Sequence, residues 1–155
     1  MFSARRTLFA LVASAAAIGT AHAANPTMFR DAGCGCCLKW LEQVKASFGG
    51  KAVIVNSADM GAIKDKQGVP QALRSCHTVL VGGYVIEGHV PAKEISRLLR
   101  EKPKGVKGLA VGGMPIGSPG MEHGSHREAY KVITFGPGGQ RVYASYAASG
   151  GAHAH

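Results

Sequence analysis

The sequence predicts an α/β domain in which a sheet is flanked by helices. Short apolar runs rich in β-branched residues alternate with segments whose apolar residues recur at helical spacing. Glycine or proline stands at most of the boundaries between these segments. Three of the four cysteines, Cys34, Cys36 and Cys37, fall where the first apolar run meets the first helical segment. This arrangement predicts a reactive or ligand-binding turn at one end of the sheet.

Residues 1–23 have the pattern of a cleaved signal peptide. Arg5 and Arg6 precede a small apolar stretch, and Ala21-His22-Ala23 is an A-x-A cleavage site. The apolar stretch is shorter than the ~20 residues that span a bilayer. We therefore expect an exported protein without stable membrane insertion, a domain over residues 24–146 and a disordered histidine-containing tail over residues 147–155.

The remaining chain is basic. Loss of Arg5 and Arg6 with the signal peptide lowers the formal charge of +9 by two, to +7. A basic balance can indicate nucleic acid or anionic surfaces as partners. Export argues against nucleic acid, so we interpret the basic residues as a solvated face. They are spread along the chain, with one concentration at Arg97, Arg100, Lys102, Lys104 and Lys107.

The first half of the domain reads as strand, helix, strand, helix. A strand over 26–29 leads through a turn at 31–33 into a helix, and Gly49-Gly50 ends that helix. The β-branched run at 52–55 predicts a buried strand. Asp59 can cap a short helix over 60–66 that Gly68 closes, and Pro70 can start another turn. Cys37, Leu41, Val44 and Phe48 share the apolar face of the first helix.

The second half predicts a hairpin, a helix, a long loop and a second hairpin. Strands over 76–81 and 84–87 flank Gly82-Gly83, a two-residue hairpin signal. Pro91 suits the first position of a helix that Lys102-Pro103 ends. Residues 105–124 are dense in glycine and proline without a helical or strand period, which predicts a functional loop. Residues 130–135 and 141–146 predict the final hairpin.

This order of elements, with cysteines at the first strand-to-helix turn, resembles a thioredoxin-like fold. The position has a physical consequence for the cysteines. Backbone N–H groups and the helix dipole at a helix N-terminus favour a thiolate, and can lower a thiol pKa from about 8.5 to about 3.5–7.5. A thiolate is both the nucleophile and the metal ligand.

The cysteine cluster has three interpretations: a structural disulfide with a spare thiol, a redox-active pair of Cys34 and Cys37, or a metal site. A third thiol between the pair would compete for the mixed disulfide of an exchange reaction. A soft metal instead gains from each added thiolate, and Cu(I) is the soft ion that cysteine and methionine select. Structural zinc sites usually show two separated pairs of ligands. We therefore favour a copper site.

Cys76 is the candidate for a fourth sulfur. It enters the third strand near the place where thioredoxin-like proteins bring a loop against their cysteine pair, although a disulfide from Cys76 to the cluster is the alternative. Four thiolates so close could bridge more than one copper ion. His77 follows Cys76, and in an extended segment it would point the opposite way. A ligand role and a structural role for His77 are equally compatible with the sequence, and for His89 we favour the structural role.

The long loop supplies further candidate ligands. Met114, Met121 and His123 lie in it, and the two methionines have no periodic apolar face to join. A thioether is a soft, neutral ligand, so we expect the loop to act as a lid that brings these groups to the thiolates. His126 is a weaker candidate. His153 and His155 could bind Cu(II) or Ni(II) loosely, but we favour a solvated tail.

Several longer motifs resemble one known family. They are C-G-C-C-x-x-W, G-V-P-x-x-L-x-S-C-H-T, G-Y-x-I-E-G-H-V-P-A and G-L-A-V-x-G-M-P-x-G-S-P-G-M-E, in this order over about residues 27–146. They resemble small exported bacterial proteins, often called CopG-like, that are linked to copper resistance. One departure is visible, because we expect a proline where Gly112 or Gly113 stands.

The resemblance implies a periplasmic thioredoxin-like domain that binds copper through its cysteines. Cys34, Cys36, Cys37 and Cys76 would be the ligands, with Met114, Met121 and His123 as further candidates. The first hypothesis is therefore a copper-binding protein in copper tolerance that holds Cu(I), with copper ions and other periplasmic copper-handling proteins as partners. The alternative is a thiol–disulfide oxidoreductase that uses Cys34 and Cys37. A disulfide-stapled binding module is the third hypothesis.

Overall fold

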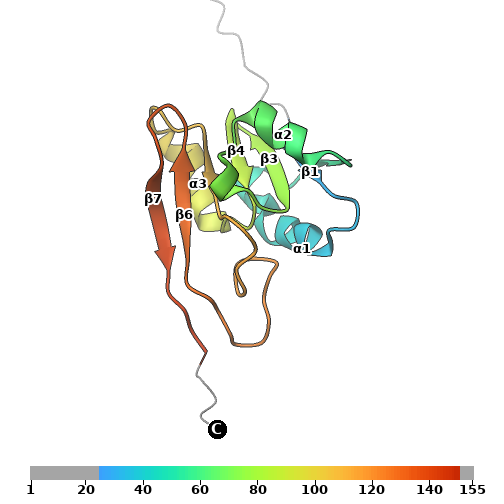
Figure 1. Cartoon of the computed structure of the whole chain (residues 1–155), viewed down its shortest axis with the longest axis vertical. Helices are drawn as coiled ribbons and strands as arrows, with labels where there is room; N and C mark the ends of the chain where they lie inside the picture. Colours follow the sequence, from blue (N-terminus) through green and yellow to red (C-terminus); the bar gives the residue numbers. More distant parts are fainter. Residues whose placement is uncertain (1–24, 151–155) are drawn as a thin grey trace, which may run out of the picture.

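The computed structural model describes residues 25–150, which form a seven-stranded mixed sheet flanked by helices (Figure 1). Short 3-10 turns follow α1 (Lys45–Phe48) and precede β3 (Gln71–Leu73). The helices and strands in chain order are β1 (Thr27–Arg30), α1 (Gly35–Val44), β2 (Val53–Asn56), α2 (Met60–Gln67), β3 (His77–Val81), β4 (Tyr84–Glu87), α3 (Ala92–Glu101), β5 (Gly108–Ala110), β6 (Tyr130–Phe135) and β7 (Arg141–Tyr146).

The sheet confirms the predicted thioredoxin-like α/β class and the final hairpin. Its strand order is β2-β1-β3-β4-β5-β6-β7. β1 is parallel to β2 and antiparallel to β3, β3 and β4 form the hairpin, and β6 pairs antiparallel with β7. Arg30, the last residue of β1, lies opposite His77, the first residue of β3. This register brings the turn that leads into α1 next to the segment that carries Cys76.

The sheet has a hydrophobic layer on each face. On one face, Trp40 of α1 and Ile95 of α3 are fully buried with Val79 of β3. Trp40 also donates a hydrogen bond from Nε1 to the carbonyl of Val90, at 2.9 Å. The other face holds a smaller apolar cluster and the buried Lys64 of α2. The smaller cluster consists of Val69, Leu73, Val85, Ala110 and Phe135.

Local signals in the sequence account for several boundaries. The Asp59 side chain accepts a hydrogen bond from the Ala62 N–H at 2.9 Å and caps α2, and Gly68 ends it at φ 65°. Gly82 and Gly83 have φ of 56° and 84°, as a two-residue hairpin turn of this kind requires. Pro91 is the residue before α3 rather than its first position.

The prediction of a buried strand at 52–55 is wrong. Val53, Ile54 and Val55 of β2 are 49%, 45% and 36% exposed. β2 is one of the two edge strands of the sheet, and among the described residues its single neighbour is β1. A β-branched run indicates a strand, but its burial depends on what lies beside it in the folded sheet.

The expectation that residues 105–124 contain no strand is also wrong. Residues Gly108–Ala110 form β5, which is buried between β4 and β6. A Cβ at Gly108 would lie 2.1 Å from the Val85 carbonyl oxygen and 2.7 Å from the ring of Phe135. Glycine here permits close strand packing, but a strand this short has no detectable period in the sequence.

The described part of the tail, residues 147–150, pairs with the domain. Ser149 and Arg127 exchange two backbone hydrogen bonds, at 2.7 and 3.0 Å. Residues 1–24 and 151–155 lie outside the described residues, and with them the expected signal peptide, His153 and His155. Within residues 25–150, no helix combines the length and the apolar character that a membrane crossing needs.

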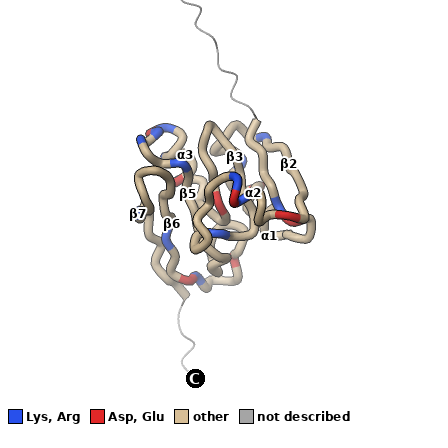
Figure 2. Tube along the Cα trace, turned by 45° about the horizontal axis from the view of Figure 1, so that its top comes forward, with Lys and Arg blue, Asp and Glu red and all other residues tan. Residues whose placement is uncertain are grey.

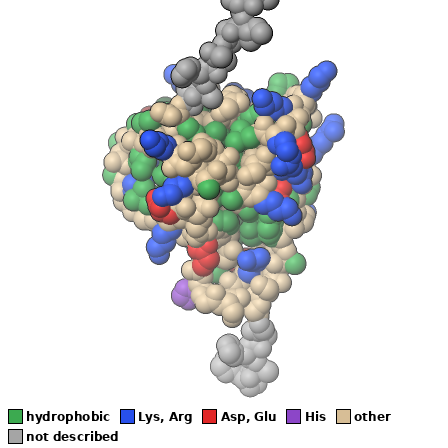
Figure 3. Space-filling view, turned by 180° about the vertical axis from the view of Figure 1, so that it is seen from behind, with side chains coloured by type: hydrophobic (Ala, Val, Ile, Leu, Met, Phe, Trp, Pro, Cys, Tyr) green, Lys and Arg blue, Asp and Glu red, His purple; other side chains and the backbone are tan. Residues whose placement is uncertain are grey.

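Basic side chains are distributed over the surface. Figure 2 shows Lys and Arg spread along the trace, with a group near the end of α3. Seen from behind, Lys and Arg side chains gather along one side of the molecule (Figure 3). Part of this charge is locally compensated, because Arg97 contacts Glu94 and Glu101 and stacks on the ring of Tyr143 at 3.6 Å.

Candidate metal centre

Three of the cysteines lie at the N-terminus of α1. Cys34 is the residue before the helix, and its N–H donates to the Asp31 carbonyl at 3.1 Å. The Asp31 side chain accepts from the Gly33 N–H at 2.7 Å and shapes the turn. Cys36 and Cys37 follow in the first turn of the helix, which contains no acidic residue. The sulfurs therefore lie at the positive end of the helix dipole without a competing carboxylate in that turn.

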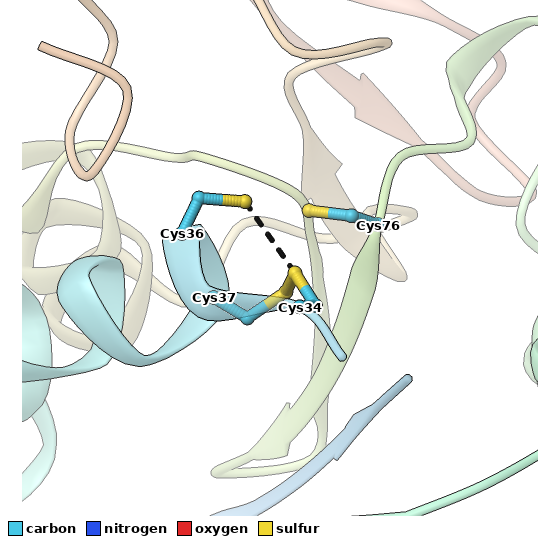
Figure 4. Close-up of side chains that lie close together, drawn as sticks. All are labelled: Cys34, Cys36, Cys37 and Cys76. Atoms are coloured by element: carbon cyan, nitrogen blue, oxygen red, sulfur yellow. Dashed lines mark hydrogen bonds between the residues drawn. A yellow bond between two sulfur atoms is a disulfide. The ribbon is translucent and has the colours of Figure 1, made fainter. Parts of the chain in front are cut away.

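The fourth cysteine comes from another part of the chain. Cys76 lies in the bend just before β3. The sulfurs of all four cysteines lie within 4.8 Å of one another, and Figure 4 shows the Cys76 sulfur directed toward the other three. Cys37 is fully buried, and the other three are partly buried. The structure thus brings together the four cysteines that sequence analysis identified.

The cluster contains a disulfide. Cys34 and Cys37 are bonded, and Cys36 and Cys76 are free thiols. The Cys36 sulfur lies 3.4 Å from that of Cys34 (Figure 4). In this form the cluster offers two thiols and a disulfide. After reduction it offers four sulfurs on one side of the turn, which is a ligand set for a soft metal.

Burial raises the pKa of the Cys76 thiol to about 11, and the negative charge of a neighbouring Cys36 thiolate adds to the effect. The hydroxyl of Ser75 acts in the opposite direction. At neutral pH Cys76 is therefore protonated in the absence of a metal. A metal ion that binds this sulfur must displace the proton.

His89 faces the same sulfur. Its Nε2 lies 3.1 Å from the Cys76 sulfur, and its Nδ1 lies 2.8 Å from the Pro119 carbonyl oxygen. Because burial lowers the pKa of His89, the ring is neutral near pH 7. A carbonyl only accepts, so Nδ1 carries the proton and Nε2 presents its lone pair to Cys76. The same tautomer holds histidine ligands in many metal sites.

His77 also approaches Cys76, in contrast to the strand alternation that we expected for this pair. Its Nδ1 lies 3.4 Å from the Cys76 sulfur. The reason is that Cys76 lies in a bend and only His77 belongs to β3. His77 is fully buried, with its ring centroid 4.3 Å from that of Trp40, and burial lowers its pKa well below the usual value. Its Nε2 has no hydrogen-bond partner among the described residues.

Cys76, His77 and His89 therefore form a second group of donors within 4.8 Å that shares Cys76 with the cysteine cluster. Sequence reasoning favoured a structural role for His89. The hairpin register contained the missing signal: Val81 pairs with Tyr84 and Thr78 with Glu87. Extending this register outward places Cys76 opposite His89.

The glycine- and proline-rich loop contacts α1 at Gly120, and in Figure 1 it lies beside this helix. A Cβ at Gly120 would lie 2.7 Å from the backbone N of Trp40 and 2.8 Å from the Cys36 carbonyl oxygen. Glu122 accepts hydrogen bonds from the Gly120 N–H and from the Gln43 side chain, both at 2.9 Å. Together with the bond from His89 to Pro119, these contacts fasten the loop beside the cysteine cluster.

The loop candidates have different positions. Met114 is 52% exposed, Met121 is partly buried and His123 is exposed. Met114 follows Gly113, whose carbonyl accepts a hydrogen bond from the Ser75 hydroxyl, and Met121 follows Gly120 at α1. Each methionine is thus one residue from a contact with a cysteine-bearing segment. His123 belongs to neither donor group of the described residues, and it pairs through its backbone with the exposed His126.

The glycine directly before Met114 has a conformational reason. Gly113 has φ of 68°, in the left-handed region. Proline holds φ near −65° and cannot adopt this conformation. Gly113 also donates its N–H to the Arg74 carbonyl at 3.1 Å, a bond that proline lacks the hydrogen to make. In this chain, a proline at position 113 would therefore break the contact between the loop and the segment before Cys76.

Replacing Gly120 with alanine tests the contact between the loop and α1. Both Gly120→Ala and Gly124→Ala place a side chain at positive φ, but only the Cβ at 120 meets other atoms within 4 Å. We expect Gly120→Ala to lower the free energy of unfolding by about 1–3 kcal/mol more than Gly124→Ala, which is the usual range for overpacking. Denaturant unfolding of both variants measures the difference. Equal losses would mean that the loop does not pack tightly on α1.

Comparison with known proteins places this geometry in a family. A family model described as a protein of unknown function, DUF411, matches residues 73–121. A search of curated proteins gave no match. Two solved structures, called copper resistance protein CopG form 1 and form 2, are each 42% identical to this chain. Each comparison covers 79% of this chain and 97% of the other, with a TM-score of 0.73.

The chain belongs to the CopG family. The resemblance that the sequence motifs indicate is thereby confirmed. The CopG structures with which it is compared are named as copper resistance proteins, and this chain has a cysteine cluster that could hold a metal ion.

Proposed function

We propose that this protein is a periplasmic copper-binding protein of copper tolerance that holds Cu(I) through Cys34, Cys36, Cys37 and Cys76. The observation that carries the proposal is the placement of four sulfurs within 4.8 Å of one another. The family supports it, since the related CopG structures are named for copper resistance.

The donor set favours Cu(I) over other metals of the periplasm. Thiolate is a soft ligand, and Cu(I) is a soft ion. The helix N-terminus stabilises the negative charge that several thiolates accumulate. Four thiolates can also bridge ions, so the site has ligands for more than one copper ion. Zinc can bind four thiolates as well, and for this reason the test below includes it.

The loop supports the proposal as a cover over the site. Pro119 fixes the tautomer of His89 and leaves the Nε2 lone pair facing Cys76. Met114 and Met121 each lie next to a contact with a cysteine-bearing segment. We infer that these soft or nitrogen donors complete the coordination of copper, with His123 as a further ligand from the same loop.

The disulfide makes copper loading dependent on redox state. Cys34 and Cys37 become ligands only after a two-electron reduction, which converts the disulfide to two thiols. In an oxidising compartment this reduction needs an electron donor. We also infer that the protein exchanges copper with other periplasmic copper-handling proteins. Thiolate ligation also releases protons, so Cu(I) binding weakens as the pH falls.

Anaerobic titration of the reduced protein, residues 24–155, with Cu(I) against a competing chelator tests this proposal. A Cys34→Ser/Cys37→Ser variant is the control, and a parallel titration with zinc measures selectivity. The proposal predicts tight Cu(I) uptake that the variant loses and zinc binding weaker than Cu(I) binding. Weak Cu(I) uptake by the wild type, with thiols that exchange readily with a model disulfide, would contradict it.

A thiol–disulfide oxidoreductase is the second candidate. It is favoured by the disulfide between Cys34 and Cys37 at the N-terminus of a helix, with Cys34 partly exposed. In this function Cys34 is the attacking thiol, and attack of Cys37 on the mixed disulfide expels the substrate thiol and forms the observed bond, with Cys36 or Cys76 as alternative resolving thiols.

Replacing Met114 and Met121 with leucine separates the two functions. Leucine is apolar and similar in size but offers no sulfur, so thiol exchange should be unchanged. If the methionines bind copper, we expect the double variant to weaken Cu(I) affinity by about tenfold or more. Met60→Leu on α2 is the matched control. Chelator competition and a model disulfide assay measure the two activities, and unchanged Cu(I) affinity would exclude the methionines as ligands.

A further inference from the structure

A buried ionic network lies behind the site, on the face of the sheet opposite Trp40. Glu87 at the end of β4 is fully buried, and its Oε1 accepts a hydrogen bond from Lys64 of α2 at 2.6 Å. Thr78 donates to Oε2 at 2.7 Å and accepts from Lys64 at 3.0 Å. Lys64 is also buried. A buried pair of this kind is often no more stable than apolar residues of the same size, so its presence calls for another reason.

A further hydrogen bond to the Glu87 carboxylate gives a reason for the buried ion pair. Oε1 of Glu87 also accepts the backbone N–H of Ser75, at 2.7 Å. Ser75 directly precedes Cys76, and Thr78 lies two residues after it. The carboxylate thus holds the chain on both sides of Cys76 and His77. These bonds act on the backbone and on Thr78, and the carboxylate bonds to neither Cys76 nor His77.

The backbone at Gly88 allows the end of β4 to come close to the segment before β3. Gly88 has φ of 69°, and a Cβ there would lie 2.5 Å from the Cβ of Ser75 and 2.5 Å from the Val111 carbonyl oxygen. Its N–H donates to the His77 carbonyl at 3.0 Å. The segment before β3 is therefore pressed against the end of β4, where Glu87 is located.

We propose that Glu87 is a positioning residue of the metal centre, whose buried carboxylate fixes Ser75 and thereby directs the Cys76 sulfur toward the cysteines of α1. The inference rests on the proposed copper site for its consequence but not for its geometry. Without an acceptor for the Ser75 N–H, the bend moves and the fourth sulfur leaves the cluster. Lys64 neutralises the carboxylate and so lets it stay buried.

Two neutral double variants separate the acceptor from the charge. Lys64→Met/Glu87→Gln removes both charges but keeps an amide oxygen for the Ser75 N–H. Lys64→Met/Glu87→Leu removes both charges and the acceptor. The two variants share the loss of both charges and differ in the polar atoms that residue 87 offers to Ser75 and Thr78. A loss of stability caused by the missing charges therefore does not affect the comparison.

The first measurement is the alkylation rate of each free thiol in the copper-free protein with the disulfide intact, resolved by peptide mass spectrometry. We expect Cys76 to react about tenfold faster in the leucine variant than in the glutamine variant, because the freed bend exposes it. Cys36 is the internal control and should react equally in both. Equal Cys76 rates in the two variants would overturn the inference.

The second measurement is Cu(I) affinity by chelator competition. The leucine variant should bind about 10–100-fold more weakly than the glutamine variant, the usual loss for a group that orients a ligand. If the wild type takes up no Cu(I), the proposed function fails while the alkylation rates still decide the positioning role. If the leucine variant does not fold, Ser75→Pro removes the same N–H, with Ser75→Ala as its control, and the same two outcomes apply.

Discussion

Replacing Cys76 with serine should lower the affinity for Cu(I) by about a hundredfold or more. A hydroxyl is a hard and weakly acidic group, so the variant offers Cu(I) only the sulfurs of α1. Removal of a group that merely orients a ligand costs about 10–100-fold, and the loss of a ligand itself should reach at least the upper end. Chelator competition under anaerobic conditions measures the change.

The same variant also tests the choice between functions. Cys76 is partly buried and not part of the disulfide, so the substitution should leave the fold and the bond between Cys34 and Cys37 in place. Disulfide exchange by that pair should continue unless Cys76 is the resolving thiol. Cu(I) affinity within about threefold of the wild type would show that the fourth sulfur is not a ligand.

Oxidation of the reduced protein should lower its affinity for Cu(I) by a similar factor. With the disulfide formed, the cluster retains only the Cys36 and Cys76 thiols, so we expect Cu(I) affinity to fall by about a hundredfold or more. The measurement is titration of one preparation before and after reduction, with free thiols counted in each state. The structure predicts two free thiols before reduction, and the sequence allows four after it.

The Cys34→Ser/Cys37→Ser variant is the control for this experiment. It lacks the bond that reduction breaks, so its Cu(I) affinity should be weak and equal before and after treatment. Tight Cu(I) binding by the fully oxidised wild type would contradict the account, since it would mean that Cys34 and Cys37 are not needed as ligands.

The sequence predicts best those features that depend on residues adjacent in the chain. The Asp31 turn and the start of α1 follow from neighbouring residues, and so does the placement of Cys34, Cys36 and Cys37 at the helix N-terminus. The proximity of Cys76 depends on pairing between β1 and β3, and it was predicted only because the order of elements resembles a known fold.

Other features depended on the assembled sheet. The β-branched residues of β2 are exposed because β2 forms an edge, which no local pattern reveals. β5 was missed because its few residues lie in a glycine-rich segment and become a strand only between β4 and β6. The position of His89 beside Cys76 follows from the hairpin register, and the interaction of His89 with Pro119 depends on the path of the loop.

X-ray absorption at the copper edge of the Cu(I)-loaded protein tests the central claim most directly, because it identifies the atoms bound to copper. The account predicts a copper environment dominated by sulfur, with fewer sulfur neighbours in Cys76→Ser and in Cys34→Ser/Cys37→Ser. A copper environment made up of nitrogen and oxygen, unchanged by these substitutions, would contradict it.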